Sequence, residues 1–294
     1  NKALREGLIA NRIQSIHGIL NGTCNYILTR MENERLPFEQ VLKDAQKAGY
    51  AEAEPGLDVD GVDTAHKAVI LASLVYGFPV PMSAVHVEGI RGLSHADIGY
   101  AAELGYRVKL LGIIKDVDGE VEVRVHPTLV PREHVLASVA GVFNAVWVSG
   151  DVAGDTLYYG RGAGRDAAAS AVLSDLADVA RNLVSGSSRR VPPFVRDAAY
   201  GKVRPVGEIE TRYYLNLSLL DRPGVLAKVA QVLGRHEVSI ASVIQKEARS
   251  GEYVPVIVVT HEAKEKRFSA ALQEIDGLDV VGARTVRLRI EDFA

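Results

Sequence analysis

The chain has 294 residues, about enough for two ordinary domains and for a sizeable core. Its 34 basic and 37 acidic residues give a net charge of -3, and no run of one sign favours a nucleic-acid or membrane partner. The single cysteine, Cys24, excludes an internal disulfide and a multi-thiolate zinc site, which favours a reducing, cytoplasmic location. The apolar stretch over 68–82 is broken by glycine and proline and falls short of the roughly 20 residues that span a bilayer.

The first predicted elements are a strand over 13–20 and a helix after the polar turn Asn21-Gly22-Thr23. Pro37 and Gly49 then bracket a second helix, because proline favours the first turn and glycine the position just past the end.

An acid-rich loop over 51–60 precedes a mostly apolar helix over 61–76, which Asp60 is expected to cap. Residues 106–130 predict a hairpin that turns at Asp118-Gly119. Its second strand places Val121, Val123 and Val125 on one face and Glu120, Glu122 and Arg124 on the other. Beyond it we expect strands over 145–149 and 155–159, a helix over 166–184 and a boundary loop over 185–193.

The last part of the chain follows a different pattern. Its expected elements are a strand over 213–220, a helix over 224–235, strands over 239–246 and 254–260, a helix over 264–275 and a strand over 281–290. This βαββαβ order is that of a ferredoxin-like domain. We therefore expect an α+β protein, with a largely antiparallel sheet domain over 1–205 and a ferredoxin-like domain over 206–294.

Asp63 and Lys67 are four residues apart on the predicted 61–76 helix, so their side chains share a face and can touch. A solvated ion pair is the plain interpretation of this spacing. The same face continues through apolar residues, however, which favours a first turn that enters a cleft. There a lysine beside a carboxylate can exchange a proton with a substrate hydroxyl.

Four carboxylates crowd the preceding loop: Glu52, Glu54, Asp58 and Asp60. By themselves they are typical of a solvated loop with a helix cap, whereas together with Lys67 they can hold a substrate that carries an ammonium group. The loop lacks ligand periodicity, so no metal site is expected.

Gly160, Gly162 and Gly164 lie between a predicted strand and a long helix, the context of a phosphate-binding turn. A tight strand-to-helix turn explains the same residues. A Rossmann fold is excluded, because no second strand with a terminal acidic residue follows the helix.

Three ordered motifs closely resemble homoserine dehydrogenase: SIHGILNGTCNYIL over 15–28, GYAEAEP over 49–55 and DVDGVDTAHK over 58–67. VHPTLVP over 125–131 and the glycine turn continue the resemblance. DRPGVL over 221–226, after the strand that starts near Arg212, resembles the start of an ACT domain, an amino-acid-sensing module. On this resemblance the domain over 1–205 is catalytic and the domain over 206–294 is regulatory.

The resemblance implies NAD- or NADP-dependent interconversion of L-homoserine and L-aspartate 4-semialdehyde, in the branch that supplies threonine and methionine. It makes Lys67 the proton-transferring residue and Asp63 its partner. Glu52, Asp58, Asn21 and Thr23 would form the substrate site. The cofactor would lie against Gly49, Gly160, Gly162 and Gly164.

The ACT resemblance implies that Asp221, Arg222, Gly224, Val225 and Leu226 bind an amino-acid effector, with threonine expected, where paired domains of a homo-oligomer meet. A capped helix start is the local alternative. Because effector and substrate would contact different domains, we expect residues 211–294 to be dispensable for the chemistry.

Members of this family begin with a Rossmann domain, and no such domain is found in these 294 residues. We therefore expect the chain to be a fragment, inactive by itself and weak in nucleotide binding. A non-catalytic amino-acid-binding module is the competing function.

Overall fold

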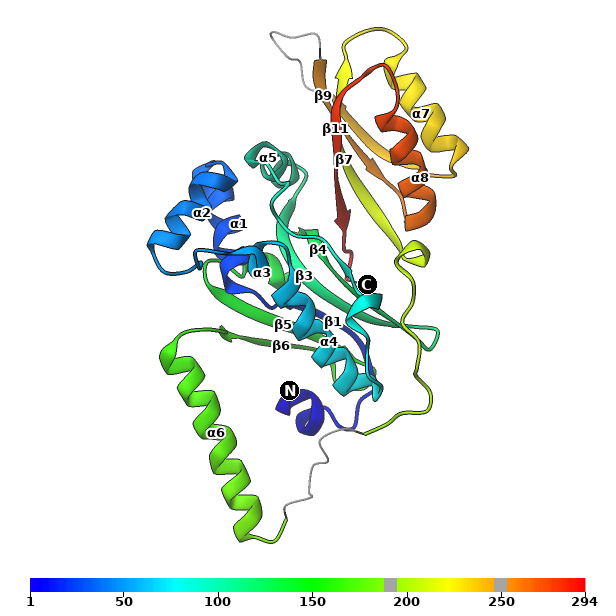
Figure 1. Cartoon of the computed structure of the whole chain (residues 1–294). Helices are drawn as coiled ribbons and strands as arrows, with labels where there is room; N and C mark the ends of the chain where they lie inside the picture. The colour runs from blue at the N-terminus through cyan, green and yellow to red at the C-terminus, as the bar shows by residue number, and fades with distance from the viewer. Residues whose placement is uncertain (188–194, 246–252, 294) are drawn as a thin grey trace.

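The computed structural model describes residues 1–187, 195–245 and 253–293, and eleven strands among them form one sheet (Figure 1). The strands are β1 (Ile13–Ile19), β2 (His86–Val87), β3 (Tyr106–Val117), β4 (Glu120–Pro131), β5 (Phe143–Gly150), β6 (Gly154–Arg161), β7 (Glu210–Leu220), β8 (Ile240–Gln245), β9 (Tyr253–Thr260), β10 (Ala263–Lys264) and β11 (Val281–Ile290). Their order is β6-β5-β1-β3-β4-β11-β7-β9-β8, with β2 beside β4 and β10 beside β7. The sheet is mostly antiparallel, as expected; β4 pairs in parallel with β11 and with β2.

Helices lie against this sheet in two groups (Figure 1). The helices are α1 (Gly22–Glu34), α2 (Phe38–Lys47), α3 (Gly56–Val59), α4 (Val62–Tyr76), α5 (His95–Glu103), α6 (Arg165–Val184), α7 (Val225–Arg235) and α8 (Glu265–Asp276), with short turns η1 (Ala3–Gly7), η2 (Met82–Ala84), η3 (Val135–Ser138) and η4 (Val206–Glu208). α1 and α4 pack near β3, whereas α7 and α8 cover the C-terminal strands. α6 extends away from the sheet, and none of its residues is buried. In the described part of the chain, no helix has the length and apolar character needed to cross a membrane.

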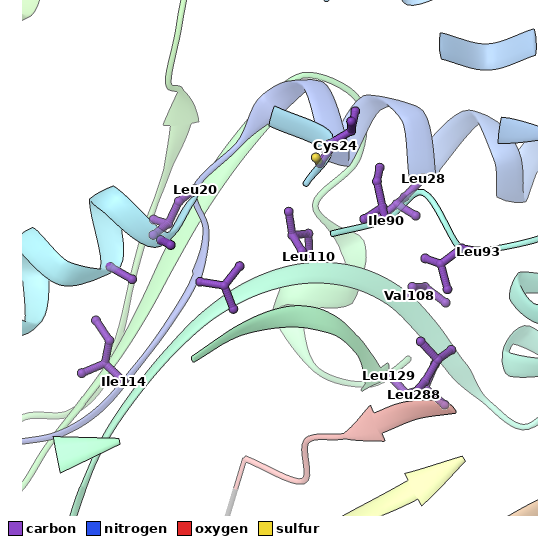
Figure 2. Packing of buried hydrophobic residues seen from close by; sticks show 14 of the residues in the cluster. Leu20, Cys24, Leu28, Ile90, Leu93, Val108, Leu110, Ile114, Leu129 and Leu288 are labelled. Carbon is purple, nitrogen blue, oxygen red and sulfur yellow. The ribbon is translucent and has the colours of Figure 1, made fainter. Parts of the chain in front are cut away.

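The main hydrophobic cluster lies between the sheet and the N-terminal helices. Figure 2 shows Leu28 of α1, Leu110 of β3 and Leu129 of β4 in it, and Leu288 of β11 beside Leu129. All four are at most 3% exposed, and burying such a side chain contributes about 1.5–3 kcal/mol. The C-terminal part of the chain therefore shares a core with the N-terminal part.

The expected βαββαβ order of the C-terminal part is confirmed. Its strands follow the sheet order β8-β9-β7-β11, and α7 and α8 enclose a second hydrophobic cluster on one face of them. The position of Lys246 in the expected strand over 239–246 lies outside the described residues, as does most of the expected boundary loop, from residue 188 onward.

The 106–130 hairpin is also confirmed, because Asp118 and Gly119 form its turn with φ of 55° and 81°. Both faces of β4 are buried, however, including Glu122 and Arg124. Arg124 Nη2 donates to Glu291 Oε2 at 3.1 Å, so the residue just past β11 covers the polar face.

One expected cap is wrong. α4 begins at Val62, so Gly61, with φ of 83°, occupies the N-cap position, and Asp60 instead forms an ion pair with Arg91. The acidic loop also contains the short helix α3, and α5 follows a capping box in which Ser94 and Asp97 bond each other's backbone amides. The sequence pattern Ser94-x-x-Asp97 could have predicted α5.

Candidate active site

Lys67 and Asp63 meet on α4 as their spacing predicted. Lys67 Nζ donates to Asp63 Oδ2 at 2.7 Å and to the backbone carbonyl of Leu20 at 2.9 Å. Leu20 lies between the end of β1 and the start of α1, so the second bond fixes the ammonium group beside the C-terminal end of this interior strand. The Lys67 side chain is 47% exposed, which leaves it accessible to a ligand.

Asn21 connects this pair to a second carboxylate. Its Oδ1 accepts from the Cys24 backbone amide at 2.9 Å and so caps α1. Its Nδ2 donates to Asp58 Oδ1 at 2.7 Å and to Asp63 Oδ2 at 2.9 Å. The Asn21 side chain therefore caps a helix and also holds two carboxylates that would otherwise repel each other.

A cavity of about 150 Å³ lies beside these acids. Its lining residues are Glu52, Glu54, Leu57, Asp58, Asp63 and His66. Its acid-rich wall suits a small substrate that carries an ammonium group. Glu54 belongs to the carboxylate cluster expected from the sequence, whereas Leu57 and His66 had no role in the sequence-based site; His66 lies one turn after Asp63 on α4, and that spacing was the signal for it.

Two of the sequence-predicted residues lie at the margin of this arrangement. Thr23 Oγ1 donates to the backbone carbonyl of Tyr50 at 2.7 Å, so it holds α1 against the segment after α2 instead of lining that cavity. Gly49 lies in the same segment with φ of 75°.

Cys24 is buried and is not a nucleophile in this arrangement. Burial, with the negative charge of Asp58 nearby, raises the pKa of the Cys24 thiol, and Sγ donates to the backbone carbonyl of Asp58 at 3.2 Å. The cysteine therefore supports the loop that carries Asp58.

The glycine turn between β6 and α6 reaches the same corner of the sheet through Asn144. A Cβ on Gly162 would lie 2.6 Å from the Asn144 side chain, and a Cβ on Gly22 would lie 3.3 Å from it. Gly160 and Gly164 instead have no atom within 4 Å of such a Cβ. The turn thus packs against Asn144 at Gly162 and leaves space at Gly160 and Gly164.

The open side of the turn has the groups that hold anions such as phosphate in other proteins. A cavity of about 410 Å³ borders the start of α6 and is lined by Arg161, Ala163, Gly164, Arg165, Asp166 and Ala167. The glycine backbone, the first amides of the helix and two guanidinium groups attract an anion there. Asp166 works against this, although it is paired with Arg165 at 3.1 Å.

The sequence-predicted effector loop lies at the far end of the molecule, between β7 and α7 (Figure 1). Asp221 Oδ1 accepts from Gln245 of β8 at 3.4 Å, and Gly224, with φ of 86°, is the N-cap of α7. Val225 is buried in the second cluster and Leu226 is 38% exposed. The loop is therefore separate from the Lys67 site.

Comparisons with known proteins agree with this geometry. A family model for homoserine dehydrogenase matches residues 1–177 and one for the ACT domain matches residues 213–279. Homoserine dehydrogenases of Pseudomonas aeruginosa and Neisseria gonorrhoeae are 46% and 44% identical over 99% of this chain, which spans 68% of each relative.

Solved structures give the same result. A homoserine dehydrogenase of Thiobacillus denitrificans matches all of this chain and 67% of its own with a TM-score of 0.92 at 44% identity. A hyperthermophilic archaeal homoserine dehydrogenase, solved in complex with NADPH, matches 62% of this chain and 51% of its own with a TM-score of 0.53 at 27% identity. The chain therefore belongs to the homoserine dehydrogenase family of oxidoreductases.

Proposed function

We propose that this chain carries the substrate site for the interconversion of L-homoserine and L-aspartate 4-semialdehyde, in the branch that supplies threonine and methionine. The observation that carries the proposal is the Lys67 ammonium group, held by Asp63 and the Leu20 carbonyl next to an acid-lined cavity. A purely regulatory amino-acid-binding module would explain the acids but not this positioned lysine.

In this proposal Lys67 moves the proton at the substrate hydroxyl oxygen. As the neutral amine it accepts that proton when the alcohol is oxidised, and as the ammonium group it donates a proton to the carbonyl oxygen in the reverse reaction. Asp63 orients the amine, and Asn21 orients Asp63 through the bond at 2.9 Å. Glu52 and Asp58, which line the cavity, bind the ammonium group of homoserine.

NAD or NADP supplies the hydride acceptor or donor when it is bound. Gly160, Gly162 and Gly164 would hold part of its phosphates, and Gly49 would lie against it.

We assign residues 1–205 to the catalytic domain and residues 206–294 to a regulatory ACT domain. Threonine is the proposed effector, bound by Asp221, Arg222, Gly224, Val225 and Leu226 where two copies pair. Exposed apolar side chains of the outer strand β8, Val243 and Ile244 at 37% and 38%, support pairing at that edge. A reducing cytoplasmic location is consistent with the single buried thiol of Cys24.

Replacing the lysine tests the catalytic role. The variant is made in the catalytically complete enzyme, meaning a protein that contains this chain together with a nucleotide-binding domain. There Lys67→Met should lower kcat for homoserine oxidation by about 10² or more, because positioned proton transfer contributes that much. Steady-state kinetics measures this, with unchanged circular dichroism as the check on folding. The matched control is Lys43→Met, an exposed lysine of α2. Near-normal turnover of Lys67→Met would remove the proposed role.

Glu52→Gln tests substrate binding. The neutral amide loses a charge-assisted bond to the substrate ammonium, so KM for homoserine should rise by about tenfold, equivalent to about 1.4 kcal/mol. The exposed carboxylate of Glu39 on α2 provides the control Glu39→Gln, which should change nothing. If both variants have the wild-type KM, Glu52 is not part of the substrate site.

The effector proposal is tested by threonine inhibition of the catalytically complete enzyme. Asp221→Asn should raise the threonine concentration for half-inhibition by about tenfold through loss of a charge-assisted bond. Asp279→Asn, which alters an 81% exposed carboxylate paired with Lys228, is the control. An enzyme that ignores millimolar threonine would make the C-terminal domain an assembly element instead.

A further inference from the structure

Residues 86–91, here called the bridge segment, connect the C-terminal part of the molecule to the acidic loop of the candidate site. The segment starts as β2, where His86 and Val87 pair with Arg124 and Val125 of β4. The Glu88 backbone amide then donates to the Val125 carbonyl at 2.8 Å. These bonds fix the backbone of the segment against β4.

At its first end the bridge segment is held by arginines of β11. Arg289 donates through Nη1 to Glu88 Oε2 at 2.9 Å and through Nη2 to Oε1 at 3.1 Å, and Arg287 also donates to Glu88. Both arginines bind Glu265 of α8 as well. Arg289 is 1% exposed and the Glu88 side chain is 27% exposed, so the bonds between them are partly buried and charge-assisted, and such bonds are among the stronger polar contacts in a protein.

Glu88 is ionised in this position. Burial alone would raise its pKa, but hydrogen bonds from His86 and Arg289, with the charges of Arg289 and Arg287, lower the pKa of Glu88 well below its usual range. The carboxylate of the bridge segment is thus fixed by charge from the C-terminal part of the chain.

At its other end the bridge segment lies directly on the acidic loop. A Cβ on Gly89 would lie 2.2 Å from the Val59 carbonyl oxygen and 2.4 Å from Asp60 Cα. The Ile90 amide donates to that same carbonyl at 2.8 Å, and Arg91 Nε bonds Asp60 Oδ1 at 2.5 Å. Only glycine permits this approach, so the segment packs directly against the backbone of Val59 and Asp60.

Val59 and Asp60 lie between Asp58 and Asp63, the two carboxylates that Asn21 holds at the candidate site. We propose that Glu88 is a positioning residue for the substrate site, which acts through Gly89 on the acidic loop that carries Asp58 and leads into α4, where Asp63 lies. This inference rests on the proposed function of that loop. It makes the C-terminal part of the chain a structural support of the substrate site, in addition to any role in effector binding.

Two variants with matched controls test the proposal in the catalytically complete enzyme. Gly89→Ala and Glu88→Gln should each raise KM for homoserine by about tenfold or more, because small displacements of binding groups are costly. KM for the nucleotide should stay within about twofold, since the glycine turn is not attached to the bridge segment. A role in general stability would instead lower the unfolding midpoint without this selective effect.

Two control variants distinguish a positioning role of the bridge segment from a general loss of protein stability. Gly92→Ala adds the same methyl group in the neighbouring turn, where no atom lies within 4 Å. Tyr213→Phe removes a hydrogen bond to Glu265 at 2.9 Å in the same ionic network but leaves Glu88 paired. Both should keep the homoserine KM within about twofold of the wild type.

The results distinguish a positioning role of Glu88 from general loosening and from failure of the proposed function. If Glu88→Gln and any folded Gly89→Ala keep the wild-type homoserine KM while Lys67→Met is impaired, the positioning role is wrong and the proposed function stands. If Tyr213→Phe raises KM as much as Glu88→Gln, the effect is general loosening and the proposal is also wrong. If Lys67→Met retains turnover, the proposed function itself fails. Should Gly89→Ala not fold, Glu88→Gln carries the test, since its side chain is 27% exposed and Arg289 keeps Glu265.

Discussion

The side-chain amide of Asn21 is the constraint on which the candidate site depends. Its oxygen caps α1, and its nitrogen holds Asp58 and Asp63. Without these donor bonds the two carboxylates would repel each other, and the partner of Lys67 would lose its orientation. The same side chain therefore fixes both the start of α1 and the arrangement of the acids in the site.

Local spacing predicted part of this site. Asp63 and Lys67 are neighbours because four residues separate them on a helix, and that geometry does not depend on the rest of the fold. The contacts of Asn21 with Asp58 and Asp63 span 37 and 42 residues, and no local pattern encodes them. The same limit explains the failed cap: Asp60 has a partner 31 residues away, Arg91, and a long-range ion pair displaced the local role.

The C-terminal part shows the same division between local and long-range information. Its element order followed from hydrophobic periodicity, whereas its parallel pairing with β4, which joins the two parts into one sheet, did not. Polar residues on β4 carry no signal that residues at the end of the chain will cover them.

The shared sheet and core also affect what a deletion of the C-terminal part would do. Removing residues 211–294 would take away Glu291, which bonds Arg124 and Lys115, and would uncover the cluster that Leu288 completes. Among the described residues, Arg124 would keep only its pair with Glu122 at 3.6 Å, and the loss of one partner of a buried ion pair is destabilising. The expectation that these residues can be deleted without consequence for the chemistry stays a prediction, and point substitutions, which keep this interface, are the more selective probe of regulation.

The most direct measurement is kcat/KM for homoserine in Asn21→Asp. Aspartate keeps the oxygen that caps α1, but it loses the donor to Asp58 and Asp63 and places a third negative charge beside them. We expect kcat/KM to fall by about 10² or more while the circular dichroism spectrum is unchanged, because misplaced catalytic groups cost that much. A value within about twofold of the wild type would contradict the account, since the site would then be organised without the Asn21 amide.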